Sequence, residues 1–484
     1  MSDKTSPDHW FDLYNRSLSR RDVLRTFRDA SALVLLGGSA ACGAARSAGR
    51  PSFNAYPFSM GVASGDPDDN SAVLWTRLGR EALDQAGLTR SPVSVGWEVA
   101  TDDNFRSIVA SGTAEARPEL GHSVHVEAPG LRAASDYWYR FTFGDAESPA
   151  GRTRTAPSRD QTPEAIRFSF ASCQNYEHGH FTALQHMADE QADVVLFLGD
   201  YLYESRFASG SGIVREHEAG EVHTLEEYRR RYETYRSQPE LQAAHASAPW
   251  IATFDDHEVD NNWAGLAAED DQTEDQMVLR MAAAFQAYYE FMPLRPFSMP
   301  TGPEIRIYRS LDYGRLMRFF VLDTRQYRTN QPCGDRTKVR CEGAFDPEAT
   351  MLGGAQEQWL FEALSGSSAR WNVLANQIMV APLAREQTDA SLGDELMYSM
   401  DRWDGYVEAQ QRLTDFLGSE RVSNPVIVAG DIHTSWINDI KRDVRDPESP
   451  TVAAEFVGTS LVSGGDGQDR TGTISDIQRL NPHI

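Results

Sequence analysis

Beyond residue 165, short apolar segments alternate with segments of helix-forming composition, and this alternation limits the possible folds more than any other feature of the sequence. Five apolar segments have the length of buried strands: 167–171, 194–198, 318–322, 371–375 and 426–429. Five other segments have helical character: 180–190, 225–235, 276–291, 355–364 and 405–417. Because alternating strands and helices are typical of α/β domains, we predict such a domain over residues 165–475.

The preceding region, residues 55–157, has a different pattern. Apolar and polar residues alternate with period two in four short segments, 71–76, 93–99, 123–127 and 137–143, which are separated by turn-forming residues. A series of such strands without a strong helical segment predicts a small β-sandwich of immunoglobulin or fibronectin type. No cluster of reactive side chains stands out in this region, so we expect it to take no part in catalysis.

Residues 1–50 have the features of an export signal. The pair Arg20-Arg21 precedes an apolar run at 30–41 and a series of small residues at 43–49. This order matches a twin-arginine signal peptide, and the alternative is a short buried helix. The run is shorter than the roughly 20 residues that span a bilayer. We therefore expect export by the twin-arginine machinery, a periplasmic or extracellular location and no transmembrane segment in the mature protein.

The chain is acidic, with 71 Asp and Glu residues against 46 Lys and Arg residues, a formal net charge of −25. Proteins that bind nucleic acids do so through basic surfaces that face phosphate groups. We therefore expect no stable complex with nucleic acid. An excess of carboxylates serves solubility or the binding of hard cations, and only the grouping of these residues distinguishes the two.

The four cysteines have different surroundings. Cys42 lies in the signal region, and we expect it to be removed with the signal rather than to carry a lipid. Cys333 and Cys341 are eight residues apart in a polar loop, which makes them candidates for a disulfide in an oxidising compartment. Cys173 is then unpaired, and it is either an inert buried thiol or a functional one.

Four polar clusters lie in the part of the chain that we predict to be α/β, and they fall just past apolar strands: 171–174, 199–204, 254–262 and 429–434. Each cluster alone is compatible with an ordinary turn, and the third is compatible with a helix start capped by Asp255. Together, the clusters place Cys, Asp, Tyr, His and Asn side chains at strand ends, where α/β proteins bind their ligands. Carboxylates that face one another need cations to offset their repulsion. The sequence therefore predicts a metal site.

The four clusters resemble those of the PhoD-type alkaline phosphatases, which belong to the calcineurin-like metallophosphoesterase superfamily. The resemblance extends to five further segments, at 58–67, 74–77, 241–245, 322–328 and 352–360. It therefore spans nearly the whole chain after the signal. It implies a calcineurin-like two-sheet α/β sandwich that follows the small β-sandwich.

The resemblance also implies the metal ligands and the ions, which in this family are one ferric iron and calcium. The implied ligands are Cys173, Asp200, Tyr203, Asp256, Asn261, Asp431 and His433. Asn262 is the alternative to Asn261, and Asp256 stands where the wider superfamily has Asn, so it either binds metal or supports His257. Thiolate and phenolate suit ferric iron, whereas carboxylate and amide oxygens suit calcium.

Three further residues are candidates for contact with substrate. We expect His257 to steady or protonate the leaving oxygen, and Arg325 to pair with phosphate through its guanidinium group. Tyr235 belongs to a segment that mixes aromatic residues with arginines, 227–236. That segment is either an amphipathic helix with a solvated charged face, or it contacts phosphate through Tyr235.

The sequence thus predicts an exported, metal-dependent phosphoesterase that hydrolyses small-molecule or phospholipid phosphate esters at alkaline pH, with a metal-activated hydroxide as the nucleophile. No Gly-x-Ser-x-Gly nucleophile motif occurs in the chain. One alternative is a phospholipase D-like phosphodiesterase on the same scaffold. The other is a binding protein whose metal site is only structural.

Overall fold

The computed structural model describes residues 53–206, 212–270, 272–387, 395–465 and 477–484. The predicted signal peptide, together with Cys42, lies outside these residues. No helix in the described part of the chain combines the length and the apolar composition needed to cross a membrane.

Two six-stranded mixed sheets form the centre of the molecule. In spatial order the first sheet contains β5 (Ser123–Ala128), β2 (Ala72–Arg77), β1 (Val62–Gly65), β11 (Pro249–Ala252), β10 (Val194–Phe197) and β9 (Phe168–Ala171). The second contains β12 (Arg309–Tyr313), β13 (Met317–Val321), β15 (Trp371–Ala375), β17 (Pro425–Ala429), β19 (Thr451–Val457) and β18 (Trp436–Lys441). A core between them joins residues such as Leu196 and Ile251 to Val321 and Val373, so the sheets pack face to face.

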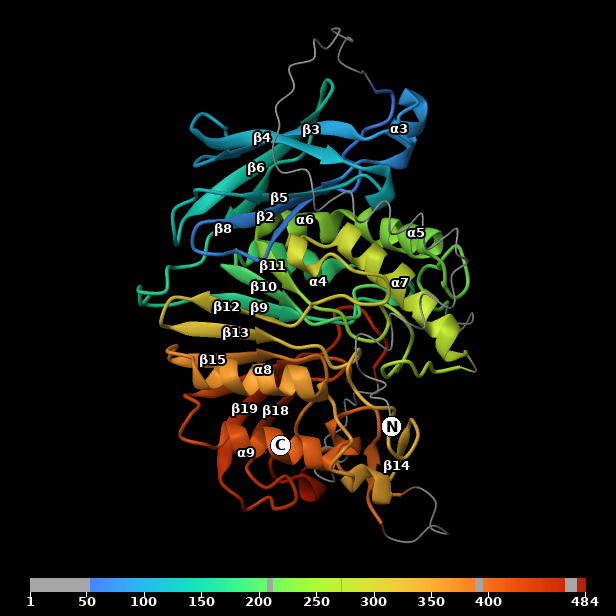
Figure 1. Cartoon of the computed structure of the whole chain (residues 1–484), viewed down its shortest axis with the longest axis vertical. Coiled ribbons are helices and arrows are strands. Elements are labelled where there is room, and N and C mark those ends of the chain that lie inside the picture. The colour runs from blue at the N-terminus through green and yellow to red at the C-terminus, as the bar shows by residue number, and fades with distance from the viewer. Residues whose placement is uncertain (1–52, 207–211, 271, 388–394, 466–476) are drawn as a thin grey trace.

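Helices cover the outer faces of this pair of sheets (Figure 1). The first sheet is covered by α4 (Thr182–Asp189), α5 (Leu225–Arg236), α6 (Pro239–Ser247) and α7 (Glu274–Phe291). The second is covered by α8 (Gly353–Ser365) and α9 (Val407–Leu417). Capping boxes at Thr224 and Thr273 start α5 and α7, since each hydroxyl accepts a hydrogen bond from the backbone N–H three residues on. The predicted two-sheet α/β sandwich is confirmed.

The N-terminal β-sandwich is also present, at one end of the molecule (Figure 1). Its outer sheet contains β4 (Ile108–Ala116), β3 (Val93–Ala100), β6 (Asp136–Phe143) and β7 (Ala146–Glu147), and β8 (Gly151–Arg154) pairs with β6. Its inner layer is β1, β2 and β5, and it packs on the outer sheet through a separate apolar core. Because β1 pairs with β11 in parallel, this inner layer is continuous with the first central sheet.

Three smaller elements complete the fold. The short helix α3 (Arg80–Ala86) lies in the N-terminal region, where we expected no helix. The strands β14 (Thr337–Val339) and β16 (Met397–Ser399) form a two-stranded sheet. The predicted disulfide between Cys333 and Cys341 is confirmed, and it closes the loop that contains β14.

Candidate metal centre

The polar clusters predicted at strand ends meet at one end of the two sheets. Cys173 follows β9, Asp200 follows β10, and both Asp431 and His433 follow β17. All four residues have left-handed backbone conformations, with φ of 62°, 55°, 66° and 59° respectively. Non-glycine residues adopt this conformation at a cost, which surrounding structure must offset, and such residues gather at functional sites. The backbone strain therefore points to the same residues as the sequence pattern does.

Their side chains form three groups, and within each group the potential metal-binding atoms lie within 4.8 Å of one another. The groups are Cys173–Asp200–His433, Asp200–Asp256–His257 and Asp255–Asp256–Asp431. Asp200 belongs to the first two groups and Asp256 to the last two, so the groups form one continuous site. The carboxylate atoms Asp200 Oδ1 and Asp256 Oδ1 are buried and have no hydrogen-bond partner among the described residues. Buried carboxylate oxygens without a hydrogen bond fit cation binding, although Asp256 Oδ1 also lies 3.5 Å from the guanidinium nitrogen Nη2 of Arg325.

The first group also includes Tyr203. Its hydroxyl oxygen lies 3.1 Å from Asp200 Oδ2 and 3.2 Å from His433 Nε2. The other ring nitrogen of His433, Nδ1, lies 2.6 Å from the carbonyl oxygen of Gly464 and donates its proton there. That bond leaves the lone pair on Nε2, facing Tyr203, which is the usual arrangement for a histidine that binds metal. We call Cys173, Tyr203 and His433 the thiol–phenol end of the site.

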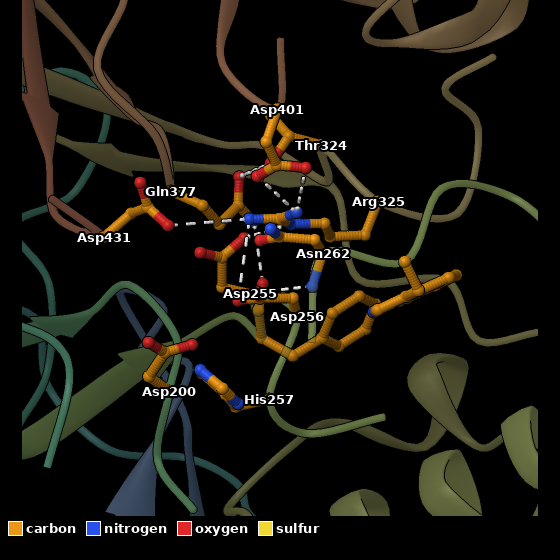
Figure 2. Close-up of polar contacts among 12 residues, drawn as sticks. Asp200, Asp255, Asp256, His257, Asn262, Thr324, Arg325, Gln377, Asp401 and Asp431 are labelled. Atoms are coloured by element: carbon orange, nitrogen blue, oxygen red, sulfur yellow. Dashed lines mark hydrogen bonds and ion pairs between the residues drawn. The ribbon is translucent and has the colours of Figure 1, made fainter. Parts of the chain in front are cut away.

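The opposite end consists of Asp255, Asp256 and Asp431 around Arg325 (Figure 2), and we call it the carboxylate end. Arg325 is 0% exposed. Its Nε donates to Asp255 at 2.5 Å, and its Nη2 lies 3.5 Å from Asp256 and 3.7 Å from Asp431. One buried guanidinium therefore neutralises part of the charge of three carboxylates.

A fourth carboxylate holds Arg325 from the other side. Asp401 accepts a hydrogen bond of 3.0 Å from Arg325 Nη1, and it also pairs with Arg328 and Gln331. Arg328 and Asp401 are both buried. The guanidinium of Arg325 is thus fixed in place by bonds on both sides, which holds the carboxylate end in one geometry.

Burial shifts the pKa values of the ligand candidates. It raises the pKa of Cys173 and of Asp200 well above their usual values, and neighbouring carboxylates raise both further. Burial also raises the pKa of Asp431 to about 7, although Arg325 acts in the opposite direction. For Asp256 the charges of Arg325 and His257 outweigh burial, so its pKa is lowered. A bound cation replaces the protons that Cys173, Asp200 and Asp431 otherwise hold.

His257 lies beside Asp200 at the junction of the two ends (Figure 2). Its Nδ1 lies 2.7 Å from Glu204 Oε2, and Glu204 is buried. Burial alone lowers the pKa of His257, but the charges of Glu204, Asp256 and Asp200 raise it well above its usual value. The surrounding carboxylates therefore favour the protonated form of the imidazole. Its ring also packs on Tyr203, with a centroid distance of 4.0 Å.

The structure corrects the prediction for Tyr235. Its hydroxyl oxygen accepts hydrogen bonds of 3.1 Å from the backbone N–H groups of Tyr176 and Tyr203, and it lies 3.2 Å from His217 Nε2. The ring is 0% exposed, because it packs in the core beneath the site. Tyr235 therefore holds the segments that carry Cys173 and Tyr203 and does not face substrate.

Two other predicted contacts are not observed directly. The side chain of Asn261 hydrogen-bonds with Glu269, and that of Asn262 donates to Asp335 at 3.0 Å. Arg325 is enclosed by carboxylates, so its contact with a substrate phosphate stays a prediction, as does the role of either asparagine as a ligand.

Sequence reasoning missed the roles of three residues at the site. Glu204 and Asp255 lie within the predicted clusters, and their acidic side chains beside other candidates were a usable signal. Asp401 follows no predicted strand and had no such signal. Its place beside Arg325 depends on tertiary structure alone.

Comparisons with known proteins identify the family of the chain. The family model described as PhoD-like phosphatase matches residues 168–484, and the model for the N-terminal domain of PhoD-like phosphatases matches residues 43–157. The fold and the matched family models thus define a phosphatase with an N-terminal β-sandwich domain. The chain belongs to the PhoD-like phosphatase family, and it is a hydrolase of phosphate esters.

A curated relative and a solved structure show how far the similarity extends. Alkaline phosphatase D from Bacillus subtilis (strain 168) is 47% identical over 437 residues, which cover 90% of this chain and 74% of the relative. The solved structure of PhoD has a TM-score of 0.85 and 47% identity, and the match covers 90% of this chain and 83% of that one.

Proposed function

We propose that this chain is an exported, metal-dependent phosphoesterase that releases phosphate from esters at alkaline pH. The observation that carries the proposal is the continuous site, in which Asp200 and Asp256 each belong to two groups of potential ligands. Shared carboxylates are how proteins hold two cations close together, and two-cation sites are suited to in-line displacement at phosphorus. A structural metal site, in contrast, is coordinatively closed, whereas a catalytic site keeps a position open for water or substrate.

The donor atoms support a different cation at each end. Cys173, Tyr203, His433 and Asp200 would hold ferric iron, since thiolate and phenolate are strong anionic donors. Asp256 and Asp431 would hold calcium through oxygen atoms, with Asp200 as the carboxylate shared between the two cations and Asn261 as the predicted further ligand. When bound, the two cations supply Lewis-acid stabilisation of the phosphoryl oxygens and an activated water.

The chain's own residues would handle the proton. Glu204 accepts the Nδ1 proton of His257, and this bond orients the ring with Nε2 as its second donor. A protonated imidazole at this position can give its Nε2 proton to the leaving oxygen as the ester bond breaks. Arg325 would keep the carboxylates of its end in place throughout the reaction rather than donate a proton.

Hydrolysis of p-nitrophenyl phosphate and bis-p-nitrophenyl phosphate, before and after chelation by EGTA, tests this function. We expect turnover of the monoester at alkaline pH, loss of turnover with EGTA and recovery with added calcium. Activity that survives exhaustive chelation would contradict a labile calcium site. Faster turnover of the diester would favour a phosphodiesterase, and turnover of neither ester under any metal condition would contradict the proposal.

Export by the twin-arginine route is a separate part of the proposal, and it rests on Arg20-Arg21 and the apolar run that follows. Replacing both arginines by lysine keeps the charge but removes the pair that this route recognises. We expect the Arg20→Lys/Arg21→Lys variant to stay in the cytoplasm, in a host whose twin-arginine machinery exports the unaltered chain. Unchanged export of the variant would refute the route without affecting the proposed reaction.

A further inference from the structure

A loop that follows β19, residues 459–464, crosses the thiol–phenol end of the site. Its backbone is bonded to the segment that carries the candidate thiol ligand: Leu461 N–H donates to Ser172 O at 3.0 Å, and Val462 N–H donates to Cys173 O at 3.1 Å. The position of the loop is therefore tied to the position of Cys173.

The two ends of the same loop contact His433. The Thr459 hydroxyl donates to the His433 carbonyl at 2.9 Å, and the Gly464 carbonyl accepts from His433 Nδ1 at 2.6 Å. The second bond selects the tautomer of His433 whose Nε2 faces Tyr203. The loop therefore contributes to the orientation of two of the three side chains at this end.

The third side chain, Tyr203, is contacted by Ser463. Ser463 Oγ lies 2.7 Å from the Tyr203 hydroxyl oxygen and 3.1 Å from the Cys173 carbonyl oxygen, and it accepts a hydrogen bond from Asn175 N–H. A serine hydroxyl has one proton to donate. When Tyr203 is a phenolate it has no proton, so the short contact requires Ser463 to be the donor.

We propose that Ser463 is a positioning residue that sets the donor strength of the Tyr203 phenolate toward the bound metal. This inference rests on the proposed iron at the thiol–phenol end and adds a residue to which no role has been assigned. A hydrogen bond withdraws electron density from a phenolate oxygen, because it stabilises the negative charge there. The phenolate then donates less to the metal, which stays a stronger Lewis acid. Outer-shell partners of this kind change metal affinity or activity by about 10- to 100-fold.

The electronic effect has an optical signature. An iron–phenolate pair absorbs visible light as charge moves from the phenolate to the metal. A hydrogen bond lowers the energy of the phenolate electrons and so moves the band to shorter wavelength. Removing the hydroxyl with Ser463→Ala should shift the band to longer wavelength at unchanged iron content, whereas a purely structural role for Ser463 predicts loss of iron or no shift.

The chain offers a matched control in the same loop. The Ser460 hydroxyl donates to the Ser463 carbonyl at 2.8 Å, so Ser460→Ala also removes one hydroxyl and one hydrogen bond from residues 459–464. We expect Ser460→Ala to leave the band in place and Ser463→Thr, which keeps a hydroxyl, to restore the wild-type position. We also expect turnover of p-nitrophenyl phosphate to fall by about 10-fold or more in Ser463→Ala, with recovery in Ser463→Thr.

Visible spectra and iron analysis test both the iron–Tyr203 assignment and the role of Ser463. The proteins compared are the wild type, Ser463→Ala, Ser463→Thr, Ser460→Ala and Tyr203→Phe. A wild-type band that disappears in Tyr203→Phe and moves to longer wavelength only in Ser463→Ala supports the inference. Two outcomes, each with a band that Tyr203→Phe removes, would refute the role of Ser463 and leave the iron site standing. In the first, Ser463→Ala leaves the band in place. In the second, Ser463→Ala and Ser463→Thr both lose their iron. An iron-replete wild type without the band refutes the iron–Tyr203 assignment, and the role of Ser463 with it.

Discussion

The two ends of the site use the same backbone design but opposite electrostatic solutions. At both ends the side chains leave strand ends in left-handed conformations, as Cys173 and Asp431 do. The carboxylate end contains its own cation, the guanidinium group of the buried Arg325. At the thiol–phenol end, burial instead raises the pKa of the Cys173 thiol and so favours its neutral form. The comparison shows that the fold brings ligand candidates together at both ends, while a buried guanidinium balances the charge of the carboxylates at one of them.

Asp200 is the residue that the two ends share, so its replacement tests the comparison most severely. Asp200→Asn keeps the size of the side chain but removes the charge that would bridge two cations. We expect turnover to fall by more than the roughly 100-fold typical of an outer-shell change, together with loss of metal from both ends. Asp415→Asn, at an exposed position of α9, is the control. Retention of both metals by Asp200→Asn would show that the ends are independent.

Arg325 belongs to the carboxylate end, so its replacement tests that end through the stability of the folded protein. Arg325→Gln leaves Asp255, Asp256 and Asp431 without the buried guanidinium that they share, whereas Asp401 keeps its pair with Arg328. We expect the free energy of unfolding, measured by urea denaturation in chelator, to fall by about 3–5 kcal/mol. Added calcium should recover part of the loss, since it supplies charge to the same carboxylates.

The control for Arg325 is Arg412→Gln, which breaks a partly exposed pair with Glu357. A pair near the surface contributes at most about 1 kcal/mol. Equal losses in the two variants would show that Arg325 is not the charge that holds the carboxylate end together.

Replacement of Glu204 tests the role of His257, the residue at the junction of the two ends. Glu204→Gln removes the charge that raises the pKa of His257 and weakens the bond that orients its ring. We expect kcat to fall by about 10- to 100-fold for an alkyl phosphate, whose leaving oxygen needs a proton. The loss should be smaller for p-nitrophenyl phosphate, whose leaving group is stable as an anion. Equal losses for both substrates would argue against proton donation by His257, and Glu357→Gln on α8 is the surface control.

Calcium binding at the carboxylate end should also depend on pH. The pKa of Asp431, raised to about 7 by burial, means that calcium must displace a proton below that pH. We expect the apparent calcium affinity, measured by calorimetry, to rise by up to about tenfold per pH unit below pH 7 and to level off above it. Asp431→Asn should flatten this dependence, and a profile unchanged in that variant would assign the proton to another group.

The same shift affects the stability of the metal-free protein, with the opposite sign. The pKa of Asp431 in the folded state lies above its value of about 3.9 in the unfolded chain. The folded state therefore holds this proton more tightly, and its stabilising effect is present at low pH and is lost as the pH rises from about 4 to about 7.

Much of the fold and half of the site could be predicted because both depend on local patterns. Strand β15 begins and ends where the apolar run predicts, and β10 and β17 differ by one residue. The clusters after β10 and β17 meet because the two sheets pack face to face and these strands end at the same end of the pair. In contrast, α6 was missed, since its short, alanine-rich segment has little amphipathic pattern.

The rest depends on contacts that leave no mark on the sequence. Asp401 reaches Arg325 from 76 residues away along the chain. The loop 459–464 is bonded to Cys173 and His433 largely through backbone groups, which every residue possesses. Tyr235 was predicted to contact the substrate because a tyrosine hydroxyl can bind phosphate. Only the structure shows that this hydroxyl accepts hydrogen bonds from two backbone N–H groups instead.

The central claim is that one site holds two kinds of cation, iron at the thiol–phenol end and calcium at the carboxylate end. Anomalous X-ray diffraction from crystals of the exported protein, recorded above and below the iron absorption edge, tests it directly. The account predicts an iron-specific peak between Cys173, Tyr203 and His433 and a second peak beside Asp256 and Asp431 that is not iron. Iron at the carboxylate end, or the same element at both ends, would contradict it.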